Sequence, residues 1–376
     1  MTENLKRTAL YEWHVAHGGR MVPFAGWEMP VQYPSGPLAE HQATRQAAGL
    51  FDIDHMGQVE VRGPQAAEFV NYVVTYDVNK MSLYDAHYAI FCYADGGCID
   101  DLFIYKLPDP DGKDGREYFF LAINASNREK DVAWLQAHAS SYDVTVKDIS
   151  DETYMLAFQG PKAPQIMDRL VISDLKQMAR FSAVQDEVFG EVPVLLGRTG
   201  YTGEDGFELF FPVEAAQQVW EGILAAGEAE GIKPVGLAAR DSLRFEACMP
   251  LYGHEIDALT TPVEAGLGFA LSPEKEFIGR EALLKQKLEK TERVLVGFEM
   301  VERGVPREGY EVSVGGTVAG KVTTGMFAPT LEKYLGMAYL PRELSYRGTE
   351  IEVLIRGKAL KAQIVKKPFY IPAYRR

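Results

Sequence analysis

The feature that most constrains this sequence is a change of pattern near residue 287. Beyond it, short apolar segments with strand spacing alternate with glycine-rich turns, and no long helical pattern interrupts them: 293–300, 310–314, 317–323, 333–339 and 351–355. Regularly spaced short strands without helices are typical of a small sandwich or barrel. The sequence therefore predicts an all-β C-terminal barrel domain over 286–376. The charged segment 285–292 is the candidate linker before it.

The region before this change, 1–285, mixes strand and helix patterns. The alternating segment 58–62 precedes Gly63-Pro64, and helical spacing follows it from Gln65 to Val74. The same order of strand, Gly-Pro and helix recurs around Gly160-Pro161. We therefore predict two related, interleaved α+β lobes in this region, with a break near 145.

Length and composition exclude several classes of protein. A chain of 376 residues needs more than one core. The formal net charge is -14 and there is no dense basic run, which argues against nucleic acid as a partner. No apolar stretch reaches the roughly 20 residues of a membrane helix, and the N-terminus lacks a signal-peptide core. We therefore expect no membrane partner and a cytoplasmic location, or a mature mitochondrial form.

Metal and nucleophile motifs are missing from the sequence. The three cysteines, Cys92, Cys98 and Cys248, contain no CxxC pair, and their odd number argues against a disulfide framework. Neither an HExxH motif nor a GxSxG elbow occurs. A lone histidine is more often structural than catalytic, so none of the seven is assigned a role. The sequence predicts no metal site.

The first candidate site segment is 96–102, where two glycines precede Asp100 and Asp101 at the start of a strand. Side chains alternate along a strand, so the two carboxylates face opposite ways. One of them can face a cleft while the other caps the turn. The alternative is a pair of solvated turn acids.

The second candidate segment is 198–208, which has three glycines within seven residues and enters an apolar strand. It lacks the ending of a phosphate-binding loop, and no helix follows as in a dinucleotide fingerprint. Glu208 alternates with apolar Phe207 and Leu209, so its carboxylate can project into a cavity and accept two N–H groups of a flat heterocycle. An ordinary surface loop is the alternative.

The third candidate segment is 236–246, with helical spacing. Arg240 lies nearer the N-terminal end of this helix than Arg244 does, and is therefore the better anion ligand. An intrahelical salt bridge is the alternative.

In this order, the segments resemble the glycine cleavage T protein (aminomethyltransferase) family. The matching stretches cover nearly the whole chain: 21–30, 51–57, 96–102, 124–131, 158–162, 198–208, 236–257, 277–283 and 366–370. The most specific are 198–208 and 240–254. The resemblance implies an α+β, three-lobed aminomethyltransferase-type fold around a central channel for tetrahydrofolate, with the β-barrel at the C-terminus.

The resemblance also implies roles for individual residues. The family's critical acid falls on Asp101, which would hold the attacking folate nitrogen and stabilise the cationic carbon. Glu208 matches the residue that grips the pterin edge, and Arg240 matches the one placed for polar or anionic groups of the folate. The matching pocket-lining positions are Tyr88, Tyr105, Asn124 and Tyr201, and Tyr374 would close the pocket from the C-terminal domain.

The implied reaction takes the aminomethyl group from the dihydrolipoyl arm of the lipoylated H protein. Its products are methylenetetrahydrofolate, ammonia and the reduced arm. Two alternatives use the same folate site: demethylation of a small S-, N- or O-methyl compound, and folate binding without catalysis. The sequence departs from the usual family pattern at Tyr76, Asp54, 88–93 and 270–273, near the expected donor side of the pocket.

Overall fold

The structure is a computed structural model that describes residues 5–110 and 117–375. It contains two compact units, and each is discontinuous in sequence. The first comprises the chain up to Ala89 together with Asp101–Asp241. The second comprises Ile90–Asp100 and the chain from Ser242 onwards. No helix within the described residues is long and apolar enough to cross a bilayer.

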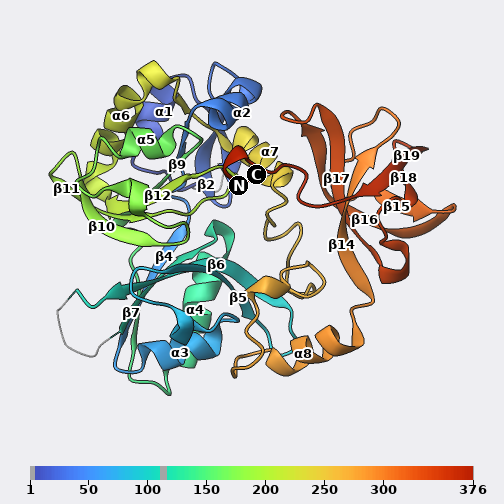
Figure 1. Cartoon of the computed structure of the whole chain (residues 1–376), viewed down its shortest axis with the longest axis horizontal. Helices are drawn as coiled ribbons and strands as arrows, with labels where there is room; N and C mark the ends of the chain where they lie inside the picture. Colours follow the sequence, from blue (N-terminus) through green and yellow to red (C-terminus); the bar gives the residue numbers. More distant parts are fainter. Residues whose placement is uncertain (1–4, 111–116, 376) are drawn as a thin grey trace. The chain divides into compact units, whose positions relative to one another are not determined.

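Two sheets organise the region before the barrel (Figure 1). The first sheet has the order β5-β6-β7-β4-β8. Its strands are β4 Gly57–Gly63, β5 Ala86–Cys92, β6 Cys98–Pro108, β7 Glu117–Ile123 and β8 Thr145–Asp148, and its helices are α3 Ala66–Val73 and α4 Arg128–Ala139. The second sheet has the order β10-β11-β12-β9-β3-β13. Its strands are β3 Gly49–Asp52, β9 Thr153–Gln159, β10 Ala183–Val188, β11 Val192–Gly197, β12 Gly206–Pro212 and β13 Lys233–Pro234, and its helices are α5 Ala163–Met167 and α6 Ala216–Ala226.

The remaining elements lie before, between and after these sheets. In the N-terminal segment, β1 Arg20–Phe24 and β2 Trp27–Gln32 form a two-stranded sheet, flanked by α1 Tyr11–Ala16 and α2 Pro37–Gln46. Two further helices follow the second sheet in sequence, α7 Leu237–Glu246 and α8 Arg280–Glu289.

The two sheets repeat one another in detail. Gly63 and Gly160, at the ends of β4 and β9, both have strongly positive φ (138° and 135°). A Cβ on either glycine would lie within about 2.5 Å of a carbonyl oxygen, so the chain requires glycine at both places. Later in each repeat, Asp77 and Asp174 cap equivalent 3₁₀ turns, η1 Val78–Lys80 and η3 Leu175–Gln177. The Gly-Pro recurrence therefore corresponds to recurring backbone geometry.

Helix α3 has one apolar face, which is buried against the first sheet. Ala66, Phe69, Val70 and Val73 are all buried, at the spacing of one helical face. The apolar face packs on β7 and β4 of the first sheet. The helix predicted from this spacing is confirmed.

The predicted C-terminal barrel is confirmed as a closed sheet in the order β14-β17-β16-β15-β18-β19. The strands are β14 Arg293–Met300, β15 Glu311–Val314, β16 Thr317–Ala328, β17 Lys333–Pro341, β18 Glu350–Ile355 and β19 Lys358–Val365. Their inward side chains, among them Phe298, Val312 and Val353, form a core of their own. The sequence reading missed β19, and most of the expected linker 285–292 is the end of α8. The division into 1–285 and 286–376, with a break near 145, stays a proposal.

Candidate active site

Asp101 lies on β6 with each carboxylate oxygen held by a different neighbour. Tyr88 Oη on β5 donates to Oδ2 at 3.0 Å, and Asn124 Nδ2, just after β7, donates to Oδ1 at 2.8 Å. The same Asn124 amide also donates to the Asp101 carbonyl at 3.0 Å. All three residues are half-buried, so the carboxylate is fixed in orientation without being sealed off. The structure thus brings together three of the predicted site residues.

The neighbouring acid, Asp100, is completely buried. In the turn itself, Asp95 Oδ1 accepts from Gly97 N at 3.1 Å. The expectation that one of the paired acids caps the turn stays a prediction. The alternative of two solvated acids is excluded by the burial of Asp100.

A row of aromatic rings runs along β6 from the Asp101 side. The ring of Phe103 lies 5.9 Å from that of Tyr88 and 6.5 Å from that of Tyr105. Asp101, Phe103 and Tyr105 alternate along the strand and therefore share one face of it. Aromatic faces of this kind suit a stacked heterocycle or benzoyl ring.

At the end of this row lies Glu208 on β12. Its Oε2 accepts from Thr199 Oγ1 at 2.6 Å and from Tyr105 Oη at 3.2 Å, while Oε1 makes no hydrogen bond to the described residues. Burial raises the pKa of Glu208; the hydrogen bonds from Thr199 and Tyr105 and the charge of Arg240 oppose the shift. Burial also raises the pKa of Tyr105, which therefore stays a hydrogen-bond donor. Glu208 is a buried carboxylate with one free oxygen, as a ligand for N–H groups requires.

Two further predicted site residues, Arg240 and Tyr201, contact each other. The guanidinium of Arg240, on α7, lies 4.7 Å from the centre of the Tyr201 ring, a cation–π contact. The start of α7 is fixed by Glu40, a completely buried residue whose two oxygens accept from Tyr33 N at 2.7 Å and Gly236 N at 2.9 Å. Glu40 was not predicted from the sequence, and it positions the helix that carries Arg240.

Arg244 has a different role from Arg240. Its Nη1 pairs with Glu255 Oε2 at 2.8 Å, and both side chains are almost completely buried within the second unit. This is a structural ion pair, in agreement with the choice of Arg240 as the ligand.

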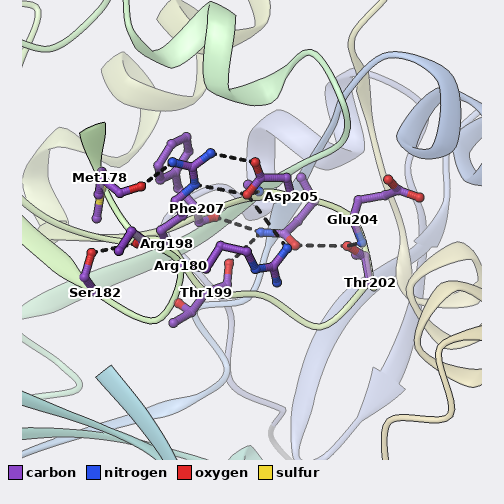
Figure 2. Close-up of polar contacts among 12 residues, drawn as sticks. Met178, Arg180, Ser182, Arg198, Thr199, Thr202, Glu204, Asp205 and Phe207 are labelled. Atoms are coloured by element: carbon purple, nitrogen blue, oxygen red, sulfur yellow. Dashed lines mark hydrogen bonds and ion pairs between the residues drawn. The ribbon is translucent and has the colours of Figure 1, made fainter. Parts of the chain in front are cut away.

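The loop 198–205 is held by hydrogen bonds among its own residues and to neighbouring segments (Figure 2). Arg198 donates to both oxygens of Asp205, from Nε at 3.1 Å and from Nη2 at 2.7 Å, and its Nη1 donates to the carbonyl of Met178. Buried Gln159 donates to the carbonyls of Thr199 and Phe207 and accepts from Thr202 Oγ1. These bonds hold Thr199 and Glu208 in place. The sequence drew attention to the glycines of this segment but did not predict the hydrogen bonds made by Arg198 and Gln159.

Two neighbouring residues of the turn after β3 also have strongly shifted pKa values. Burial raises the pKa of Asp54 to about 9, with the charge of Asp52 adding to the shift. Burial, together with the charge of Arg240, lowers the pKa of His55 to about 3. His55 received no role from the sequence because a single histidine carries no spacing signal.

Tyr374 is the remaining predicted residue. It lies in the 3₁₀ turn Ala373–Arg375 of the second unit and is 40% exposed. Its role in closing the pocket stays a prediction. No cluster of three or more His, Cys, Asp or Glu suited to a metal ion occurs within residues 5–110 and 117–375.

Comparison with known proteins identifies the family. The family model described as the GCVT N-terminal domain matches residues 10–275, and the one described as the glycine cleavage T-protein C-terminal barrel domain matches residues 293–370. This chain belongs to the glycine cleavage T-protein family. The T-protein family uses tetrahydrofolate as a co-substrate.

Individual T-protein relatives match along the whole chain. It is 50% identical to an aminomethyltransferase of Symbiobacterium thermophilum over 100% of both chains, and 49% identical to one of Alkaliphilus oremlandii over 98% of both. Its fold matches the crystal structure of the glycine cleavage system aminomethyltransferase T from Bartonella henselae with a TM-score of 0.91 and 33% identity, over 99% of this chain and 100% of that one. The predicted aminomethyltransferase-type fold and enzyme class are confirmed. These matches support the glycine-cleavage function and not the demethylase or the non-catalytic alternative.

Proposed function

We propose that this aminomethyltransferase carries out its reaction at the site formed by Asp101, Glu208 and Arg240, with tetrahydrofolate as acceptor. The donor is the aminomethyl group on the dihydrolipoyl arm of an H protein, and the products are methylenetetrahydrofolate, ammonia and the reduced arm. The observation that carries the proposal is the Asp101 carboxylate, whose two oxygens are fixed by Tyr88 and Asn124. A cytoplasmic location, or a mature mitochondrial form, belongs to the proposal as well.

The proposed chemistry assigns Asp101 an electrostatic and positioning role. Transfer of the one-carbon unit passes through a cationic, iminium-like carbon, and a fixed negative charge beside it stabilises that charge without having to reorganise. The carboxylate also orients the attacking folate nitrogen. Holding two reactants in line lowers the barrier, because the entropy of bringing them together has already been lost on binding. The two donors from Tyr88 and Asn124 keep the carboxylate from turning away.

Glu208 and Arg240 bind the folate in this proposal. The free Oε1 of Glu208 accepts hydrogen bonds from the N–H groups on the flat edge of the pterin. Arg240 binds polar or anionic groups of the folate. Tyr105 and Tyr201 provide ring faces beside these two ligands. Tyr374 is proposed to close the pocket.

The assay supplies tetrahydrofolate and aminomethylated H protein and measures methylenetetrahydrofolate and ammonia. Formation of both products in equal amounts is expected. Methyltetrahydrofolate formed from a methylated small molecule, with no turnover of H protein, would instead establish the demethylase. Folate binding without either product would establish the non-catalytic alternative.

A further inference from the structure

His55 is buried, yet its imidazole makes no hydrogen bond within the described chain. The residue is 1% exposed, and Nδ1 has no hydrogen-bond partner. No described residue pairs with Nε2 either. Buried polar side chains normally satisfy their hydrogen-bonding groups, so an unpaired buried ring requires an explanation. One explanation is that a bound ligand supplies the missing hydrogen-bond partner of the ring.

The turn that carries His55 is rigid. Asp52 Oδ1 accepts from Asp54 N at 3.1 Å, and Asp54 Oδ1 accepts from Met155 N at 3.1 Å. The rings of His55 and Phe24 pack in a T-shaped arrangement, with ring centres 5.4 Å apart and planes at 90°. The packing of the His55 ring therefore does not depend on hydrogen bonds from its own nitrogens.

The charge state of His55 follows from its surroundings. Burial and the nearby guanidinium of Arg240 lower its pKa to about 3, so the imidazole is neutral at physiological pH. A neutral imidazole has one N–H donor and one acceptor nitrogen. Orphaned buried N–H groups are rarer than under-satisfied acceptors, which assigns the proton to Nε2 and leaves the lone pair on buried Nδ1. His55 thus offers a neutral donor beside the charged donor Arg240.

This donor complements the carboxylate of Glu208. The lactam edge of a reduced pterin presents a carbonyl oxygen, O4, beside the N–H groups of N3 and the 2-amino group. The free Oε1 of Glu208 suits those N–H groups, whereas O4 needs a donor. Arg240 acts on both residues, because its charge lowers the pKa of His55 and that of Glu208.

We propose that Nε2–H of His55 donates a hydrogen bond to O4 of the bound pterin, which makes His55 a binding residue that selects 4-oxo pterins. This inference rests on the proposed function, because it assumes that the site binds tetrahydrofolate. A neutral donor holds the carbonyl without bringing a second cation next to Arg240. It also gives the unpaired ring a partner.

The test compares two ligands by calorimetry: tetrahydrofolate and its 4-amino analogue, in which an amino group replaces O4. Wild-type protein is expected to prefer tetrahydrofolate. In His55→Phe, which keeps a ring but has no donor, we expect tetrahydrofolate to bind about tenfold more weakly and the 4-amino analogue to be almost unaffected. The matched control is His138→Phe, on α4, where the ring nitrogen Nδ1 lies 2.8 Å from the Trp134 carbonyl and no change in preference is expected.

Equal losses for both ligands in His55→Phe, or no loss for either, would overturn the proposal. If wild-type protein binds no tetrahydrofolate at all, the proposed function fails rather than the role of His55 alone. Should His55→Phe not fold, His55→Gln and His55→Asn replace it, because the glutamine amide reaches the Nε2 position and the asparagine amide the Nδ1 position. The glutamine variant is then expected to keep more of the 4-oxo preference, and equal preferences in the two variants would contradict the inference.

Discussion

The two sheets share the order of four strands, β5-β6-β7-β4 and β10-β11-β12-β9, but supply different parts of the site. In the first sheet, Tyr105 on β6 pairs with Phe120 on β7. At the equivalent place in the second sheet, Gly197 on β11 pairs with Glu208 on β12. A tyrosine in one repeat thus corresponds to a glycine in the other, and a phenylalanine corresponds to a carboxylate.

The difference shows how a repeated scaffold gains an asymmetric site. A Cβ on Gly197 would lie 2.7 Å from the Tyr105 ring and 2.9 Å from its hydroxyl, so the missing side chain leaves the space that Tyr105 occupies. Tyr105 can therefore reach Thr199 and Glu208 of the second sheet. The first sheet provides the reactive carboxylate Asp101, and the second provides the ligand Glu208.

The largest expected effect comes from removing the charge on the first sheet. Asp101→Asn keeps the shape and one acceptor for Tyr88 or Asn124, but no longer stabilises a cationic carbon. We expect kcat to fall about a thousandfold, with the Kd of tetrahydrofolate changed only a few-fold. Product formation gives the first quantity and calorimetry the second.

The control is Asp186→Asn on β10 of the second sheet, which should leave kcat unchanged. If the affinity for folate collapses in Asp101→Asn, Asp101 is mainly a ligand and the division of labour between the sheets is wrong.

The next effect tests the ligand on the second sheet. Glu208→Gln keeps an acceptor for Thr199 and Tyr105 but loses the charge, so we expect tetrahydrofolate to bind about ten- to a hundredfold more weakly. Whereas the affinity for tetrahydrofolate falls, the thermal stability of the variant relative to wild type should rise at neutral pH. Burial raises the pKa of Glu208, so wild type loses stability as pH rises from the unfolded value through the folded one, while the variant does not.

Thermal unfolding at pH 4 and pH 7 checks this sign. The melting temperature of Glu208→Gln relative to wild type should be higher at pH 7 than at pH 4. The reverse order, or unaltered folate binding, would count against Glu208 as a buried ligand.

A smaller effect tests the space at Gly197. Gly197→Ala forces Tyr105 away, and we expect a loss of about 1–3 kcal/mol in the free energy of unfolding and a several-fold weaker affinity for tetrahydrofolate. Urea unfolding and calorimetry measure the two. Gly268→Ala is the matched control, because nothing lies within 4 Å of the added Cβ there. Equal behaviour of the two variants would show that Tyr105 does not depend on this gap.

The smallest effect on activity is expected at the connection between the sheets. Asp54 lies in the turn from β3 to β4, and burial raises its pKa to about 9, so it is neutral in the folded protein at pH 7. Wild type should therefore lose stability as pH rises from about 4 to about 9, and Asp54→Asn should not. The melting temperature of the variant minus that of wild type should grow over this interval, with kcat nearly unchanged. A constant difference would place Asp54 in a solvated environment.

The sequence predicted the elements of this site better than their contacts. Glu208 stands out by its alternation with apolar neighbours and Arg240 by its place near the start of a helix, whereas the family resemblance was needed to choose Asp101 over Asp100. Gln159, Glu40 and Gly197 do not stand out, because their roles depend on strand pairings and helix contacts between residues far apart in the chain. The end of α8 was read as a linker because its charges hide a weak apolar face.

His55 illustrates a different limit. Nothing in its spacing distinguishes it from His14, which the structure shows paired with Asp52 at 2.8 Å and with Tyr33 at 2.9 Å. The two histidines differ only in whether the fold brings partners to the ring. That information exists only in three dimensions.

The hairpin Ile90–Asp100 has a consequence for the order in which parts of the chain fold during synthesis. It belongs to the second unit, where Cys98 N donates to the carbonyls of Asp257 and Thr260, and Gly96 packs near Leu283. These partners leave the ribosome long after the hairpin does, although domains otherwise tend to fold as they emerge. Asp101 is the next residue after this hairpin. The first residues of β6 are therefore anchored only when about three quarters of the chain has been made, whereas the rest of the strand pairs with β7 inside the first unit and does not depend on those later segments.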